Sequence, residues 1–429
     1  MSFQTKTGLR KKAAFQRIIA DFIENPLGQV YSREIDVPLD VPKIVSLLGP
    51  RRAGKTYVLF DIIQRLRKTV PAHRLVYINF EDDRLFPLQL SDLDALLQGY
   101  YEMHPANKDE QVWFFLDEVQ EVEHWEKFVR RLSDHENCRI YLTGSSSKLL
   151  SRELASGLRG RTLPYEVFPL SFSEFLSFHQ MDIQVHSSKG QAQIYHWLKR
   201  YLMQGGFPEL AFLPRELHRP TVNEYIDLML YRDLAERFSL KNPALLKYLL
   251  KFMLTNIANP ISIARLFNDL KTQGYGVGKN TVYEYISYLE EAFALFKTSI
   301  WSRSVRTQAV NPSKYYSIDP AFKHAMSVGE DTGRIFENIV FLALRRKGIE
   351  PHYWLDGQEV DFYWENGQLI NACYDISSPD TRNRELSGLQ KAMNQLGIRE
   401  AQLITWEEEG EVRSGDALVH IRPLWKFLR

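Results

Sequence analysis

The chain is poor in cysteine, carries almost no net charge and lacks a long hydrophobic run. Its 429 residues include only two cysteines, Cys138 and Cys373, which argues against a disulfide framework and for a reducing compartment. Because the net charge is +1, any nucleic-acid binding needs a local basic patch rather than a global field. No apolar run approaches the roughly 18 residues of a membrane helix, and the N-terminal residues lack the apolar core of a secretory signal. We therefore expect a cytoplasmic protein that does not associate with membranes.

The length and composition are those of a globular protein with several cores. A chain of 429 residues corresponds to about three domains. Hydrophobic residues make up 44% of the chain and charged residues 25%, as is ordinary for globular proteins.

A phosphate-binding pattern, G-x-x-x-x-G-K-T, occurs at Gly49-Pro50-Arg51-Arg52-Ala53-Gly54-Lys55-Thr56. Glycine lets the chain curl so that backbone N–H groups converge on phosphates, the lysine reaches the β- and γ-phosphates, and the hydroxyl ligates Mg²⁺. An apolar run at 44–48 precedes the loop and a helical pattern follows it, so the loop lies at a helix N-terminus. The sequence predicts a site for ATP and Mg²⁺. Adenine is inferred because no guanine-reading Asn-Lys-x-Asp stretch occurs.

Three further apolar runs, at 75–80, 112–116 and 139–142, each end in polar residues, as strands of an open parallel sheet do at its ligand-binding edge. The run at 112–116 leads into Asp117 and Glu118. We predict that Asp117 holds the Mg²⁺ shell, usually through water, and that Glu118 polarises the attacking water. Acidic pairs after strands also serve as helix N-caps, and this alternative stays open.

Polar and basic residues follow the run at 139–142. Thr143 and Ser145 occupy the place where related ATPases carry a γ-phosphate sensor, although Thr-Gly-Ser also forms ordinary turns. Arg152, Arg159 and Arg161 lie in a stretch with little apolar content. An arginine here would complete the transition state in cis, or in trans across the subunits of a homo-oligomer. The alternative is a solvated basic loop.

Several motifs together resemble one known family. They are the loop at 49–56, Phe-Phe-Leu-Asp-Glu-Val-Gln at 114–120, Leu-Thr-Gly-Ser-Ser at 142–146, Gly-Arg at 160–161, Pro-Leu-Ser-Phe-Ser-Glu-Phe at 169–175 and Gly-Gly-Phe-Pro-Glu at 205–209. With these motifs the chain is similar to bacterial and archaeal AAA-like P-loop ATPases that carry a carboxy-terminal domain of unknown function. The resemblance implies an α/β fold: a P-loop parallel sheet of the additional-strand glutamate type, a helical lid, a winged helix and a restriction-endonuclease-like α/β domain.

The expected domain boundaries follow from these parts. We expect a P-loop ATPase domain at 1–178, a helical lid at 179–243, a winged-helix domain at 244–325 and a restriction-endonuclease-like domain at 326–429. Within the lid, Gly205-Gly206-Phe207-Pro208 interrupts a helical pattern and is interpreted as a hinge-like junction.

Residues 244–325 have the pattern of three helices followed by a hairpin, which resembles a helix-turn-helix. The outward side of the third helix would present four residues near its N-terminus, where recognition helices contact bases: Asn280, Thr281, Tyr283 and Glu284. Lys279, at the start of this helix, is a further DNA-binding candidate.

A stretch without acidic residues runs from Glu291 to Asp319 and includes Arg303, Arg306 and Lys314, which would suit the phosphate contacts of a wing. Duplex DNA is the expected partner. Contacts with protein partners or subunit packing are the alternative.

The last domain carries the acidic residues of a nuclease-like site, Glu337, Asp361 and Asp375. In active members of the restriction-endonuclease fold such carboxylates bind Mg²⁺, and a lysine two residues after the last one supports the attacking water. Ser377 stands at that lysine position, and Lys391 on the following helix is a candidate substitute.

Three interpretations of the acidic residues follow: a degenerate scaffold, which the missing lysine favours, an active metal-dependent nuclease, and structural acids paired with Arg382 or Arg384. For the whole chain we predict a Mg²⁺-dependent ATP hydrolase whose nucleotide state controls a DNA-binding module. The alternatives are a nucleotide-gated scaffold for protein partners with slow turnover, and an ATP-licensed nuclease.

Overall fold

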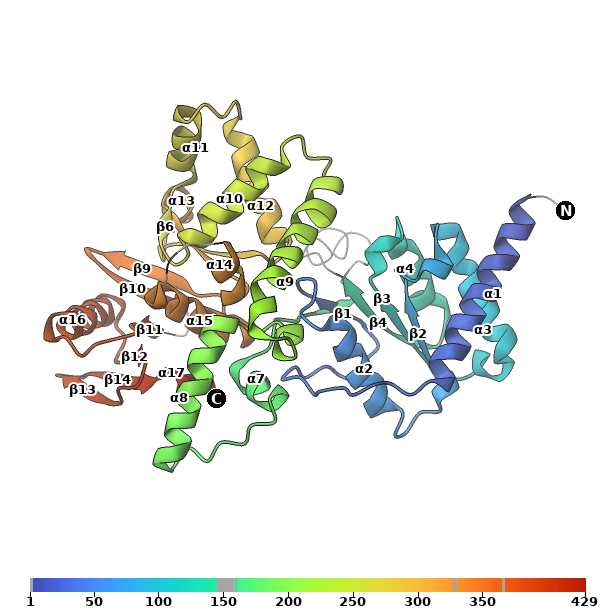
Figure 1. Cartoon of the computed structure of the whole chain (residues 1–429), viewed down its shortest axis with the longest axis horizontal. Coiled ribbons are helices and arrows are strands. Elements are labelled where there is room, and N and C mark those ends of the chain that lie inside the picture. The colour runs from blue at the N-terminus through green and yellow to red at the C-terminus, as the bar shows by residue number, and fades with distance from the viewer. Residues whose placement is uncertain (1–2, 145–157, 159, 327–328, 330, 365–366) are drawn as a thin grey trace. The chain divides into compact units, whose positions relative to one another are not determined.

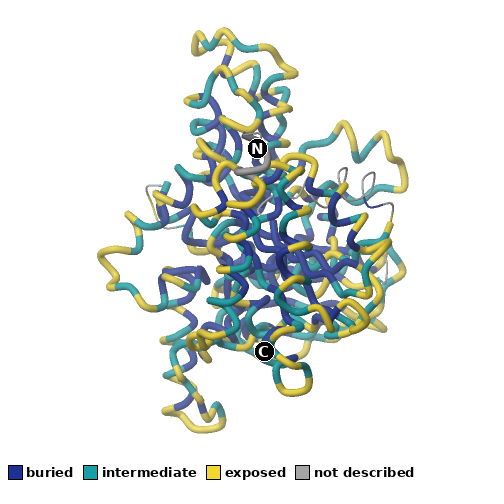
Figure 2. Tube along the Cα trace, turned by 90° about the vertical axis from the view of Figure 1, so that its right-hand side faces the viewer, coloured by how far each residue is buried: buried dark blue, intermediate teal, exposed yellow. Residues whose placement is uncertain are grey.

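The computed structural model describes residues 3–144, 158, 160–326, 329, 331–364 and 367–429 (Figure 1). The chain forms two compact units, Met1–Val167 and Phe168–Arg429. Buried residues concentrate in the strands and on the helix faces that pack against them, while loop tips are exposed (Figure 2).

The first unit contains a five-stranded, fully parallel sheet in the order β2-β3-β4-β1-β5. This confirms the predicted parallel α/β sheet. Strand β4 lies between β1, which leads into the phosphate-binding loop, and β3, which delivers Asp117. In chain order the elements are α1 (Phe3–Glu24), β1 (Ile44–Leu48), α2 (Lys55–Leu66), η1 (Ala72–Arg74), β2 (Leu75–Asn79), η2 (Asp83–Leu85), η3 (Leu90–Asp92), α3 (Leu93–Met103), η4 (Pro105–Lys108), β3 (Val112–Asp117), η5 (Val119–Glu121), α4 (Trp125–His135), β4 (Cys138–Gly144) and β5 (Thr162–Glu166).

The apolar face of α2 packs on one face of this sheet. Leu59 and Ile63 are fully buried in one cluster with Leu47 of β1 and Phe115 of β3. Burying a side chain of this size contributes about 1.5–3 kcal/mol. Strands β1 and β3 are buried along their whole length, as expected for central strands of a parallel sheet covered on both faces. This packing fixes the start of α2 at the carboxyl end of β1.

The apolar-run analysis did not find α1 and β5. Strand β5 has no continuous apolar run, and among the described strands it pairs with β1 at the edge of the sheet. It contains Pro164, which an edge strand tolerates because one side of its backbone needs no partner. Helix α1 packs against α3 and β2, contacts that a local pattern does not reveal.

The second unit combines helices with a three-stranded antiparallel sheet, β6-β8-β7, and a six-stranded mixed sheet, β13-β14-β12-β11-β10-β9. Its elements are α7 (Phe172–Phe178), α8 (Ser188–Gln204), η6 (Pro208–Ala211), α9 (Arg215–Leu228), the π-helix η7 (Met229–Glu236), α10 (Pro243–Thr255), β6 (Pro260–Ile261), α11 (Ile263–Thr272), α12 (Lys279–Glu291), β7 (Leu295–Thr298), α13 (Val305–Val310), β8 (Ser313–Ser317), α14 (Pro320–Met326), α15 (Thr332–Arg346), β9 (His352–Asp356), β10 (Gln358–Trp364), β11 (Gln368–Ala372), α16 (Pro379–Leu396), β12 (Glu400–Thr405), β13 (Gly410–Ser414), β14 (Ala417–Pro423) and α17 (Leu424–Phe427).

One hydrophobic core runs through the second unit. It joins buried residues of α7, α10, α12 and α15 with Phe427 near the end of the chain. The segments expected as lid, winged helix and nuclease-like domain therefore share a core. The boundaries drawn between them stay predictions.

The hinge interpretation of the glycine pair is wrong. Gly205 and Gly206 are buried, and Gly205 has φ +78°. A Cβ on Gly205 would meet Asp319 Oδ1 at 1.8 Å, and one on Gly206 would meet Leu170 O at 2.4 Å. The Gly206 N–H also donates to Asp319 Oδ2 at 2.7 Å. Glycine is needed at 206 because the Leu170 backbone approaches closely, and at 205 because the Asp319 side chain approaches and φ is positive. The junction is therefore close-packed and not hinge-like.

Strand β11 ends at Ala372 and does not reach Asp375, one of the predicted acidic residues. Asp375 accepts a hydrogen bond from the Ser377 N–H at 2.8 Å, the local turn that Asp side chains favour. This bond competes with strand continuation and leaves Asp375 in an exposed connection.

Candidate functional site

The phosphate-binding loop joins the carboxyl end of β1 to the first residue of α2. Its conformation depends on two residues with positive φ, Arg52 (65°) and Gly54 (94°). Gly49 has no room for a side chain, since a Cβ there would meet Val167 O at 2.1 Å. The Ala53 carbonyl accepts a hydrogen bond from Arg33 Nη1 at 2.9 Å, which ties the loop to the segment before β1. The loop is therefore positioned by Val167 next to Gly49 and by Arg33 next to Ala53.

Lys55 is buried at the start of α2, with 4% of its surface exposed. Its ammonium donates to the carbonyls of Gly49 at 3.1 Å and Pro50 at 3.0 Å, and lies 3.9 Å from Glu118 Oε1. A buried ammonium needs such partners because burial without them is costly. The lysine of the loop and the glutamate after β3 therefore share one site, as the sequence predicts.

Asp117, at the end of β3, is the centre of a network of hydroxyl groups. The Thr56 and Tyr77 hydroxyls each donate to Asp117 Oδ2 at 2.8 Å, and the Thr143 hydroxyl donates to Oδ1. Burial raises the pKa of Asp117 and the charge of Glu118 adds to this, while the three hydroxyl bonds oppose it. The carboxylate is held in one orientation by α2, β2 and β4 together.

Glu118 has a left-handed backbone, with φ 53° and ψ 51°. This region is uncommon for residues other than glycine, and such residues cluster at functional sites. The Glu118 N–H donates to the Thr143 hydroxyl at 2.9 Å, and Gln120 Nε2 donates to Glu118 Oε2. Both ends of the residue are thereby fixed, and its side chain points to Lys55.

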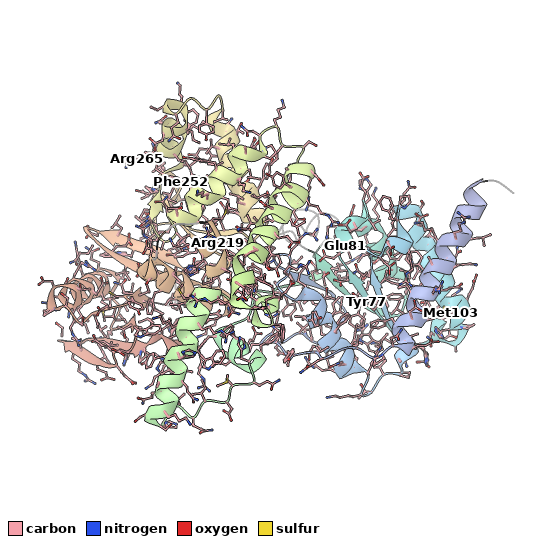
Figure 3. All side chains as sticks on the ribbon, viewed as in Figure 1. Tyr77, Glu81, Met103, Arg219, Phe252 and Arg265 are labelled. Atoms are coloured by element: carbon pink, nitrogen blue, oxygen red, sulfur yellow. The ribbon has the colours of Figure 1, made fainter. Side chains whose placement is uncertain are left out.

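Tyr77 is a site residue that the motif analysis missed. In the parallel register Tyr77 lies opposite Phe115, so Asp117 is its diagonal neighbour on the same face of the sheet. Burial, and then the nearby Asp117 carboxylate, raise the pKa of the Tyr77 hydroxyl, which keeps it a proton donor. Figure 3 shows Tyr77 on β2 and Glu81 beyond the end of that strand. Strand parity could have revealed this contact.

The remaining loop and sensor candidates have different placements. Arg51 Nη1 forms an ion pair with Glu81 at 3.2 Å, at the carboxyl edge of the sheet. Ser145 and Arg159 lie outside the described residues. Arg161 precedes β5 and its carbonyl accepts from Ile44 N at the start of β1, so it lies at the opposite edge of the sheet from the loop. There it pairs with Asp134 at 2.7 Å. The structure does not bring Arg161 to Lys55 and Asp117.

The DNA-binding candidates lie on α12 and in the β7–β8 connection. Lys279, Asn280 and Tyr283 are exposed, Thr281 is half-buried, and Lys279 Nζ lies 5.9 Å from the centre of the Tyr283 ring. In the connection, Arg303 and Arg306 are exposed.

Lys314 does not belong to a basic wing surface. It is fully buried on β8, with Nζ 2.8 Å from Glu337, 2.7 Å from Glu359 and 2.9 Å from Asp361. Burial lowers the pKa of Lys314, but the Asp361 and Glu337 carboxylates outweigh burial and hold it well above its ordinary value. The acidic residues predicted to form a nuclease-like site thus surround an internal ammonium. Lys314 is the cationic partner that one of the three interpretations assigned to Arg382 or Arg384.

The other nuclease-like candidates lie apart from this cluster. Instead of Asp375, Asn371 of β11 is beside Asp361, and its Oδ1 accepts from the Asp361 N–H at 2.9 Å. Lys391 is half-buried and donates to the Asp356 carbonyl at 2.6 Å. Arg382 pairs with Glu408 at 2.8 Å and Arg384 with Glu385 at 2.7 Å.

The sheet, loop and acidic strand end define the first unit as a P-loop domain of the AAA type. Residues 41–176 match the description of an AAA domain, and residues 195–332 match a domain of unknown function, DUF8612. The chain is 36% identical to the uncharacterized protein MJ1544 of Methanocaldococcus jannaschii over 97% of this chain and 95% of that protein. An uncharacterized protein of Haemophilus influenzae is 30% identical over 75% of this chain and 79% of its own length. The chain belongs to the family of these two proteins.

Solved structures are more distant. The Walker-type ATPase paby2304 of Pyrococcus abyssi matches with a TM-score of 0.43 and 14% identity, over 73% of this chain and 95% of that protein.

In the described part of the chain, no helix has the length and apolar character needed to span a membrane.

Proposed function

We propose that this protein is a Mg²⁺-dependent ATP hydrolase whose nucleotide state controls a DNA-binding winged-helix module. The observation that carries the proposal is the network in which Asp117 accepts from Thr56, Tyr77 and Thr143 while Glu118 points to Lys55. Such a network supports hydrolysis because phosphoryl transfer depends on positioning and on charge neutralisation.

The donor set fits Mg²⁺. The Thr56 hydroxyl and the Asp117 carboxylate offer oxygen ligands next to each other, and Mg²⁺ is usually bound by one or two carboxylates together with substrate phosphates. When bound, the ion neutralises charge on the phosphates.

The protein's own residues supply the rest of the chemistry. Lys55 neutralises phosphate charge from the start of α2, where backbone N–H groups also favour an anion. Glu118 orients and polarises the attacking water. Its fixed backbone keeps the carboxylate in place, which avoids reorganisation during the reaction. An arginine in trans stays a prediction, and Arg159 and Arg161 are its candidates.

The DNA-binding part of the proposal rests on the segment from α10 to β8. Its described elements are the helices α10, α11, α12 and α13 and the strands β6, β7 and β8, which form one sheet with β8 in the middle. The exposed residues Lys279, Asn280 and Tyr283 at the N-terminal end of α12 would reach base edges, and Arg303 and Arg306 would contact phosphates.

Turnover of ATP by the wild type and by Glu118→Gln, with and without duplex DNA over a salt series, tests the proposal. We expect the variant to keep nucleotide binding but to lose turnover by a factor on the order of 10²–10⁴, since it loses the general base. Glu123→Gln is a matched control, because Glu123 is exposed and pairs with the neighbouring His124 at 3.5 Å. Equal turnover in Glu118→Gln and Glu123→Gln would refute the assigned role of Glu118.

The DNA arm separates the proposal from a protein scaffold. Phosphate contacts weaken steeply with ionic strength, so DNA-stimulated turnover should disappear between about 50 mM and 200 mM salt. The stimulation should also be lost in the double variant Lys279→Ala/Arg306→Ala. If the rate of ATP turnover is the same with and without DNA at every salt concentration, a nucleotide-gated scaffold that binds protein partners is favoured.

A further inference from the structure

The second unit contains a basic groove, and none of the described residues that line it belongs to α12 or to the acidic cluster around Lys314. The groove has a volume of about 410 Å³. One wall is formed by α9 and η7 and the other by α10, with the end of α14 completing the lining. The residues that matter for its chemistry are Arg219, Asn223, Tyr231, Lys247, Tyr248 and Lys251.

The spacing of these residues follows from helix geometry. Arg219, Asn223 and Tyr231 are separated by four and eight positions, so they lie along one face of α9 and its continuation η7. Lys247, Tyr248 and Lys251 share a face of α10 in the same way. η7 packs against α10, so the two faces meet at the groove. Figure 3 labels Arg219 on α9.

Two cations that line the groove form no ion pair with the described residues. Lys247 is paired with Asp227 at 2.7 Å. Arg219 and Lys251 are exposed, and neither forms an ion pair with any residue that the structure describes. No carboxylate is among the described residues that line the groove. Two cations on facing walls therefore favour an anionic ligand that lies between them.

An exposed aromatic ring accompanies the two cations. Tyr231 is 46% exposed, and it lies in a π-helix, a rare geometry that is frequent at functional sites. Tyr248 is half-buried and packs against Tyr275 with ring centres 5.6 Å apart, so the floor of the groove is also aromatic. A ligand that suits this groove has both negative charge and a flat apolar face.

We propose that this groove binds single-stranded nucleic acid, with Arg219 and Lys251 contacting phosphates and Tyr231 stacking on a base. Unpaired bases expose the flat faces that stack on aromatic side chains, whereas the bases of a duplex are already stacked on each other. The inference does not depend on duplex binding by α12. The substitutions that test it lie outside α12 and outside the nucleotide site, so they leave both of those sites unchanged.

Fluorescence anisotropy of a labelled oligothymidine with the full chain tests the groove. The double variant Arg219→Ala/Lys251→Ala should bind more weakly, and its salt dependence should be shallower by about 1.4 in log–log slope, at about 0.7 for each phosphate contact. Tyr231→Ala should weaken binding on the order of tenfold, while Tyr231→Phe, which keeps the ring, should bind as the wild type does.

A matched control removes the same charge elsewhere in the same unit. Lys189 and Lys199 are exposed on α8 and do not line the groove, so Lys189→Ala/Lys199→Ala should bind like the wild type. Equal affinities of the groove variant and this control would overturn the proposal, as would the absence of binding by the wild type. Circular dichroism of each variant shows whether it is folded.

Two competitors distinguish the source of binding. Inorganic polyphosphate offers charge without bases, so it should compete more weakly than unlabelled oligothymidine. Its affinity should be the same for the wild type and for Tyr231→Ala. Equal competition by polyphosphate and oligothymidine would identify a simple anion site and overturn the assignment to nucleic acid. Loss of oligothymidine binding in Lys279→Ala/Arg306→Ala, with the groove variant unaffected, would assign the binding to α12 instead.

Discussion

The Thr143 hydroxyl accepts a hydrogen bond from the Glu118 N–H at 2.9 Å. The same hydroxyl donates to the Asp117 carboxylate, so one side chain on β4 orients both acidic residues at the end of β3. Because the backbone of Glu118 is left-handed, this bond helps to hold a conformation that non-glycine residues seldom adopt. Thr143 therefore connects the metal-side carboxylate to the proposed base.

Replacing Thr143 should damage stability and turnover together. Thr143→Val keeps the shape but removes the hydroxyl, which leaves the Glu118 N–H and one oxygen of Asp117 without this partner. We expect a loss of about 1–3 kcal/mol in unfolding free energy, since Thr143 and Asp117 are buried. Thr143→Ser keeps the hydroxyl and should retain most of the stability and turnover. Thermal unfolding and ATP turnover of the two variants check this prediction. Equal stability and equal turnover of Thr143→Val and Thr143→Ser would contradict it.

Gly49→Ala should impair nucleotide binding by moving the loop. The new Cβ would lie 2.1 Å from the Val167 carbonyl oxygen, so backbone must shift, at a cost on the order of 1–3 kcal/mol. We expect affinity for a fluorescent ATP analogue to fall by about tenfold or more. Gly28→Ala is the control, because a Cβ at Gly28 meets nothing within 4 Å. A Gly49→Ala protein that binds as tightly as Gly28→Ala would show that the loop tolerates the shift.

Lys314→Met should strongly destabilise the second unit. The substitution removes the ammonium that contacts Glu337, Glu359 and Asp361 and leaves buried carboxylates without a counter-ion. Breaking a buried pair in this way costs about 3–5 kcal/mol. Lys391→Met removes a surface ion pair with Asp356 at 3.1 Å and should cost no more than about 1 kcal/mol. Urea unfolding compares the two variants, and a Lys314→Met protein as stable as Lys391→Met would show that the cluster needs no ammonium.

The same cluster bears on nuclease activity. With Asp375 outside the carboxylate cluster and Asn371 beside Asp361, we expect plasmid DNA to stay intact with the wild type in the presence of ATP and Mg²⁺ or Mn²⁺. Cleavage that is lost in Glu337→Gln would restore the nuclease interpretation.

Glu290→Gln should remove part of the pH dependence of stability. Burial raises the pKa of Glu290 to about 7, Lys297 opposes this and Glu291 adds to it. The folded state therefore holds a proton that the unfolded state releases from about pH 4.5 upward, and stability falls as the pH rises from about 4.5 to 7.

The glutamine variant cannot release that proton, so it should lose this decline and be more stable than the wild type at pH 7.5, by about 1–3 kcal/mol. At pH 4.5 the two proteins should be equally stable. Urea unfolding at both pH values measures the difference, and a constant offset between the two proteins would contradict the raised pKa.

The sequence by itself determined the phosphate-binding site. The loop at 49–56, the buried runs before and after it and the Asp117-Glu118 pair are local patterns, and each fixes its own conformation through glycine, strand alternation or helix start. Lys55 and Asp117 then lie at the same edge of the sheet, because the carboxyl ends of all its parallel strands are at that edge.

Only the tertiary structure decided which polar residues share a partner. The sequence placed Lys314 on a basic surface, but Lys314 is the buried counter-ion of Glu337 and Asp361. The sequence also indicated a hinge at Gly205-Gly206, but this pair forms a close-packed junction. Tyr77 and Thr143 are joined to Asp117 across three strands. These contacts connect residues far apart in sequence, and the free energy that selects them comes from burial and charge pairing in three dimensions, which local residue spacing does not encode.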